Sequence, residues 1–107
     1  MEDRLTEQLK NRSVRPSTPG ELVTDLLECN GLSITKAATR LGVSRVTLSR
    51  LINDQQSLSV DMAQRLGRFF GNGAALWLNL KQQVELWDLL HAEDEPYKSI
   101  EPLKLAA

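Results

Sequence analysis

The sequence predicts an all-α domain of five helices with an extension at each end. Apolar residues recur every three or four positions through most of residues 18–91, which is the period of an amphipathic helix. Residues that favour helix ends interrupt this pattern at intervals. A chain of 107 residues, 41% hydrophobic and 25% charged, forms one domain with a modest core. We therefore divide it into an N-terminal extension (1–17), a helical domain (18–91) and a C-terminal tail (92–107).

The first helix of the predicted domain has a clear beginning and end. Thr18 is expected to cap it, and Pro19 is the first helical residue, where a missing N–H costs nothing. Asn30 and Gly31 end it, since both tolerate the left-handed conformation that follows a helix. Its buried stripe consists of Leu22, Val23, Leu26 and Leu27.

Residues 33–53 then predict a helix-turn-helix motif, with helices at Ser33–Leu41 and Ser44–Asp54. Ala37 and Ala38 are small enough for a second helix to cross closely, and Gly42 supplies the positive φ that ends the first helix. The second helix is expected to bury its apolar side, which consists of Leu48, Leu51 and Ile52.

The opposite side of that second helix carries the groups needed to read a major groove. Arginine pairs with guanine, asparagine with adenine, and an apolar side chain meets the methyl group of thymine. Together with the start of the first motif helix, the candidate DNA-contacting residues are Thr35, Lys36, Ser44, Arg45, Val46, Thr47, Ser49, Arg50 and Asn53. The alternative is a solvated helix face in an ordinary helical bundle, but the complete two-helix pattern favours DNA.

The fourth helix is predicted to start at a Ser59 cap and to stop at Gly71, and the fifth to run from about Gly73 to His91. The fifth helix carries two apolar stripes, more than one small core can bury, so part of it is expected to form a homodimer. Trp77 and Trp87 are assigned to its own core. The residues expected to face the second subunit are Leu78, Leu86 and Leu89. The alternatives are a fifth helix that packs wholly on its own chain and a monomer that pairs only on DNA.

The two ends are predicted to be less ordered. Leu5 and Leu9, spaced i, i+4, allow a short helix that docks on a partner, although the sequence slightly favours a frayed, solvated terminus. The tail is acidic and interrupted by Pro96 and Pro102, which predicts an extended or disordered segment.

Charge is distributed unevenly along the chain. The net charge is −1, but residues 33–72 carry six cations and two carboxylates, a local charge of +4 that leaves −5 for the remainder. This predicts one basic face suited to phosphate contact and acidic extremities.

A single Cys29, expected to be half-buried, and a single His91 exclude an internal disulfide and leave no metal or nucleophilic constellation. We therefore expect neither an enzyme nor a cofactor. No apolar run approaches the ~20 residues of a membrane span and the N-terminus is charged, so a cytoplasmic protein without a signal peptide or membrane anchor is expected.

Four short stretches resemble the HigA antitoxin family, which has a phage-repressor (XRE-type) helix-turn-helix domain. They are TPGE at 18–21, LGVSR at 41–45, RFFG at 68–71 and WLNLK at 77–81. Two positions depart from the family pattern: Thr18 stands where His is usual, and Ile34 where Gln is frequent and commonly contacts the DNA backbone or braces the recognition helix. A different DNA affinity or operator preference is therefore expected.

The resemblance implies an antitoxin that binds a RelE-like toxin, an endoribonuclease that cuts mRNA on the ribosome, and that dimerises to repress its own operon. Leu5 and Leu9 are then the candidates for toxin contact, because they have no obvious place in a five-helix core. A stand-alone helix-turn-helix repressor without a toxin is the alternative, distinguished by whether a short basic reading frame lies beside this one.

Overall fold

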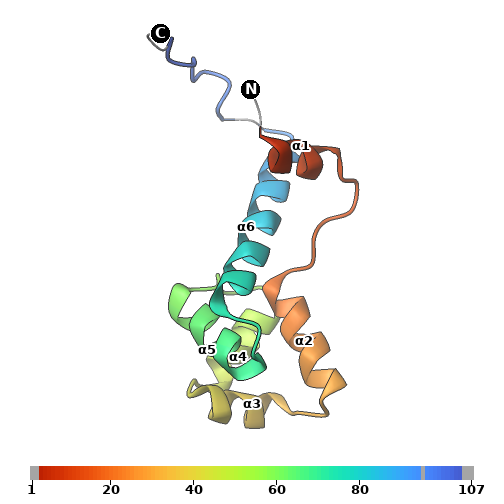
Figure 1. Ribbon diagram of the computed structural model, residues 1–107, viewed down its shortest axis with the longest axis vertical. Coiled ribbons are helices and arrows are strands. Elements are labelled where there is room, and N and C mark those ends of the chain that lie inside the picture. The colour runs from red at the N-terminus through yellow and green to blue at the C-terminus, as the bar shows by residue number, and fades with distance from the viewer. Residues whose placement is uncertain (1–2, 95, 105–107) are drawn as a thin grey trace.

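The chain folds into helices joined by short loops (Figure 1). The computed structural model describes residues 3–94 and 96–104, and this part contains six helices and no strand. They are α1 (Arg4–Asn11), α2 (Pro19–Cys29), α3 (Ile34–Leu41), α4 (Arg45–Ile52), α5 (Val60–Phe70) and α6 (Ala74–Leu90). The all-α prediction is confirmed. The preference for a frayed N-terminus is wrong, because α1 adds a sixth helix.

The first five helices share one way of starting. A polar side chain at the cap position accepts a hydrogen bond from the backbone N–H three residues later, which satisfies one of the amides that a helix leaves unpaired at its start. The caps are Asp3, Thr18, Ser33, Ser44 and Ser59. The sequence predicted caps at Thr18 and Ser59 and placed Ser33 and Ser44 at the starts of their helices, whereas the Asp3 cap was not predicted.

Helices α2 to α6 enclose the core. Its largest fully buried side chains are Val23, Leu48, Leu66 and Trp77. The indole N–H of Trp77 donates to Asn72 Oδ1 at 2.7 Å, so the polar edge of this buried ring is satisfied. Trp77 therefore lies in the core of its own chain, as predicted.

A small residue sets the crossing of α5 and α6. A Cβ atom built on Gly67 would lie 2.3 Å from the carbonyl carbon of Gly73, a distance that real Cβ atoms do not adopt. Only glycine lets the start of α6 pass this close to α5, and the amide of Gly73 donates to the Gly67 carbonyl at 3.1 Å.

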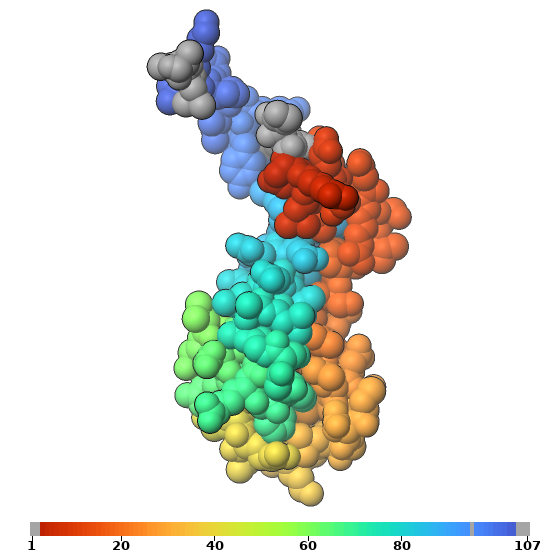
Figure 2. All heavy atoms as spheres, viewed as in Figure 1, coloured from red at the N-terminus to blue at the C-terminus, as the bar shows by residue number. Residues whose placement is uncertain are grey.

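Helix α1 covers the C-terminal half of α6, which extends beyond the core (Figures 1 and 2). Leu9 of α1 is buried there. The indole N–H of Trp87 donates to the Arg12 carbonyl at 3.0 Å, and the ring of His91 stacks on that of Trp87 with centroids 3.9 Å apart. Trp87 packs on its own chain and holds the N-terminal segment in place, but it is half-buried and lies outside the core cluster, so its assignment to the core is wrong.

Beyond Leu90, the described residues contain a turn but no helix; the Ile100 amide donates to the Tyr97 carbonyl at 3.0 Å. Cys29 is exposed at the end of α2, so the expectation that it is half-buried is wrong. Among the described residues, no helix is both long and apolar enough to cross a lipid bilayer.

Candidate nucleic-acid interface

Helices α3 and α4 form the predicted helix-turn-helix. Ala37 and Ala38 are buried where the two helices cross, as their size requires. Gly42 follows α3 with φ +74°, and the Val43 amide donates back to the Ala38 carbonyl at 3.0 Å. This is the glycine-dependent helix ending expected from the sequence. It turns the chain sharply enough for α4 to start three residues later, at Arg45.

Helix α4 buries Leu48 and Leu51 and directs its other side outward. Arg45, Val46 and Arg50 are exposed, and Val46 keeps 57% of its surface accessible. The helix ends at Ile52, two residues earlier than predicted. The face therefore combines two cations with an apolar group.

Several polar side chains on this face already form hydrogen bonds with neighbouring residues of α4. Ser44 Oγ accepts the Thr47 amide at 3.0 Å and donates to Thr47 Oγ1 at 2.8 Å. Asn53 is the cap after α4, and its Nδ2 donates to the Ser49 carbonyl at 2.9 Å. Thr47 and Ser49 are half-buried, whereas Ser44 and Asn53 are exposed. The amide oxygen of Asn53 is left to accept a hydrogen bond from a base or a bound water.

The start of α3 adds a second polar surface. Thr35 and Lys36 are exposed in its first turn, next to the Ser33 cap. Residues 33–53 contain four cations and no carboxylate. Both helix starts also carry the positive end of a helix dipole, so anions are favoured along this side.

Arg65 is exposed, but it makes contacts that the sequence did not predict. Its Nη1 donates to the Leu41 carbonyl at 2.9 Å, and its Nε binds Asp61 Oδ2 at 2.9 Å. Arg65 thus links α5 to the carbonyl end of α3, just before the turn. The i, i+4 pair with Asp61 is readable in the sequence, but the contact with Leu41 is not.

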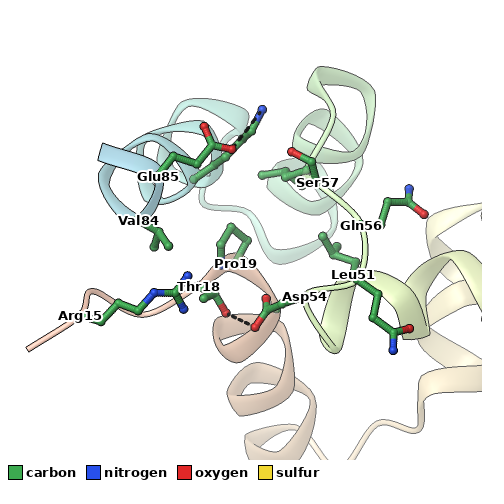
Figure 3. Close-up of a pocket in the computed structure, with 13 residues that line it drawn as sticks. Arg15, Thr18, Pro19, Leu51, Asp54, Gln56, Ser57, Val84 and Glu85 are labelled. Atoms are coloured by element: carbon green, nitrogen blue, oxygen red, sulfur yellow. Dashed lines mark hydrogen bonds and ion pairs between the residues drawn. The ribbon is translucent and has the colours of Figure 1, made fainter. Parts of the chain in front are cut away.

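The C-terminal end of α4 meets α2, α6 and the N-terminal segment around a pocket of about 260 Å³ (Figure 3). Asp54 follows α4 with φ +56°, and the Thr18 hydroxyl donates to its Oδ2 at 3.3 Å. Arg15 and Glu85 line the same pocket. No motif in the sequence predicted that these segments meet.

Helix α6 carries a separate groove of about 590 Å³ on the side shared with α1. Its lining residues are Leu5, Asn79, Gln82, Gln83, Glu85, Leu86 and Leu89. Two of the three leucines predicted for the dimer contact, Leu86 and Leu89, therefore lie together. The third, Leu78, is partly buried against the core of its own chain and does not line the groove.

The two leucines assigned to a toxin differ in their surroundings. Leu5 is 48% exposed, whereas Leu9 is only 3% exposed. The premise that neither has a place in the chain's own packing is therefore wrong for Leu9, because α1 folds and turns this side chain onto α6.

Three comparisons bear on this interface. Residues 25–77 match the family model described as Helix-turn-helix. The chain is 36% identical over 90 residues to antitoxin HigA-1 of Vibrio cholerae, covering 83% of this chain and 85% of that protein. It is 38% identical over 82 residues to YbaQ, an uncharacterized HTH-type transcriptional regulator of Escherichia coli K12, covering 76% of this chain and 73% of that protein. The structure of Pseudomonas aeruginosa antitoxin HigA with the higBA promoter is similar at TM-score 0.74 and 36% identity, covering 84% of this chain and 100% of that chain.

Proposed function

Because the chain belongs to the HigA family of helix-turn-helix proteins, we propose that it is the antitoxin of a type II toxin–antitoxin pair. In this role it neutralises a RelE-like mRNA-cleaving toxin and, as a dimer, represses its own operon. The observation that carries the DNA-binding part is the exposed side of α4, where two arginines and Val46 stand in a stretch without carboxylates.

Operator recognition is assigned to residues of α3 and α4. Arg45, Val46 and Arg50 are exposed on the helix that would enter the major groove, where they can meet base edges. Thr35 and Lys36 stand at the start of α3, where a phosphate would approach the helix dipole. Further hydroxyl and amide groups around this face come from Ser44, Thr47, Ser49 and Asn53.

Arg45→Ala tests the readout. If Arg45 contacts a base edge, its loss is expected to cost about 1–3 kcal/mol of specific binding. The measurement is a titration at fixed salt with the duplex that the unaltered protein selects from a randomised pool. Arg4→Ala removes the same charge from exposed α1 and serves as the matched control. Operator affinity unchanged in both Arg45→Ala and Arg50→Ala would remove α4 from the interface.

The dimer is assigned to the groove on α6. Leu86 and Leu89 lie beside amide side chains that can hydrogen-bond across a two-fold axis, and Leu89 is 41% exposed. Two recognition helices on one inverted repeat must sit about 34 Å apart, which requires a fixed contact remote from α4. The far half of α6 meets that requirement. Leu78 lies toward the core end of this helix and is at most peripheral to the contact.

We assign the contact with the toxin to Leu5 and to the outer side of α2. Leu9 contributes only by holding α1 in place. Glu21, Asp25 and Glu28 recur every three or four residues along α2 and are exposed. Such a stripe is complementary to a small basic toxin, and Leu5 supplies an exposed apolar anchor nearby in sequence.

Deleting residues 1–14 is expected to weaken the complex with the toxin and to leave operator binding in place. The deletion keeps Arg15, every residue of the helix-turn-helix and the two groove leucines, Leu86 and Leu89. It also removes Leu5 from the edge of that groove, so sedimentation first checks that the shortened chain still dimerises. The probe is the protein encoded by the small neighbouring reading frame, titrated against the full chain and the deletion. Undiminished affinity for that protein would move the toxin contact to another surface.

A stand-alone transcriptional repressor is the second candidate. It is favoured by the similarity to YbaQ, which is described only as an HTH-type transcriptional regulator. The adjacent reading frame discriminates the two functions: a repressor of this second kind has no small basic protein encoded beside it.

A further inference from the structure

The end of the recognition helix rests directly on the start of α2. A Cβ atom on Gly20 would lie 2.4 Å from the Leu51 carbonyl oxygen and 2.7 Å from that of Ile52. The first turn of α2 and the last turn of α4 are therefore in backbone contact. A shift of one helix at this point displaces the other.

Asp54 completes this contact at the residue where α4 has ended. Its backbone adopts φ +56°, which is uncommon for a residue with a side chain. Its Oδ2 accepts the Thr18 hydroxyl at 3.3 Å, and its Oδ1 lies 2.9 Å from where a Gly20 Cβ would be. The carboxylate thus sits at the N-terminal end of α2, where the helix dipole favours a negative charge.

Arg15 connects the same point to α6. Its Nε and Nη2 bind the two carboxylate oxygens of Asp88, each at 2.8 Å. This hydrogen bonding is the main reason that the pKa of Arg15 is raised, with further attraction from Asp88, Asp54 and Glu21. The guanidinium points into the pocket beside Thr18 and Asp54 in Figure 3. One cation therefore lies between the carboxylate on α6 and the carboxylate that ends α4.

We propose that Asp54, together with Thr18 and Arg15, fixes the orientation of α4 relative to α6 and thereby determines which half-site spacing the dimer accepts. The inference rests on the proposed function, in which α6 holds the two subunits together and α4 reads the DNA. The distance between two recognition helices then depends on how rigidly each α4 is joined to its α6. Asp54 is a positioning residue in this scheme and touches no base.

The variant Asp54→Gly tests whether Asp54 positions α4 relative to α6 or only stabilises the fold. Glycine adopts φ +56° without strain, and this relief offsets part of the cost of the lost hydrogen bond with Thr18 and of the freer unfolded chain, so the variant is expected to fold without the carboxylate. We expect the preference for the native spacing over spacings changed by one base pair to fall about three- to tenfold, the effect of losing one hydrogen bond. The probes are the inverted repeat selected by the unaltered protein and two derivatives with one base pair added or removed between the half-sites.

Two further variants control this experiment. Asp54→Asn keeps an acceptor for Thr18 and tolerates positive φ, so it should restore most of the spacing preference. Asp94→Gly removes an exposed carboxylate in the tail and should leave the preference unchanged. A full spacing preference in Asp54→Gly overturns the inference, and so does a loss shared equally by Asp94→Gly. If the unaltered chain selects no duplex at all, the proposed function itself fails.

Discussion

Gly20→Ala is expected to lower the free energy of unfolding by about 3 kcal/mol or more, at the upper end of what overpacking costs. The added methyl group would lie within 2.4–2.9 Å of Leu51 O, Ile52 O and Asp54 Oδ1, and two of these are backbone atoms that no rotamer change can move. The first turn of α2 must then separate from the end of α4. Thermal unfolding followed by circular dichroism should show a melting temperature lower by roughly 10–20 °C.

Gly31→Ala is the matched control for this change. Gly31 has φ +59° but no atom within 4 Å of a built Cβ, so alanine there meets backbone strain without a clash. The expected cost is about 1 kcal/mol. A Gly20→Ala variant that unfolds at the temperature of Gly31→Ala would show that the contact between α2 and α4 can open without loss, which would also weaken the argument for coupling at Asp54.

The elements of this fold could be predicted because they are encoded locally. Caps such as Thr18, Ser44 and Ser59 and the glycine at position 42 act within one helical turn, so they can be read in order along the sequence. The core stripes follow from the helical period alone. For this reason α2 to α6 were predicted close to their observed bounds.

What could not be predicted depends on contacts between distant segments. Helix α1 is too short to be stable alone and forms where Leu9 and Arg12 meet α6. The contact between Arg12 and Trp87 joins residues that are 75 positions apart in the sequence. The pair of Arg15 and Asp88 is separated in the same way. Periodicity shows which side of α6 is apolar. It does not show that α1, at the N-terminus of the same chain, covers part of that side, and for this reason Leu9 was assigned to a partner.

Leu86→Glu combined with Leu89→Glu is expected to convert the dimer into a folded monomer. Both side chains line the groove on α6, and two carboxylates would meet their symmetry copies across a two-fold contact without opening a cavity in the core. A monomer engages one half-site at a time, so operator affinity should fall roughly 10²- to 10⁴-fold with the loss of bivalent binding. Sedimentation and operator titration measure the two effects.

The matched control is Leu76→Glu, on the same helix and 42% exposed but outside the groove. It should remain a dimer with unchanged operator affinity, and all variants should retain the helical content of the unaltered chain. Because Leu86 is partly buried beside α1, a double variant that loses helical content would report on the packing of α1, and Leu89→Glu alone then provides the test. A variant that is still dimeric with Glu at position 89 would mean that another surface joins the subunits, and the spacing between the two α4 helices would have to be set from there.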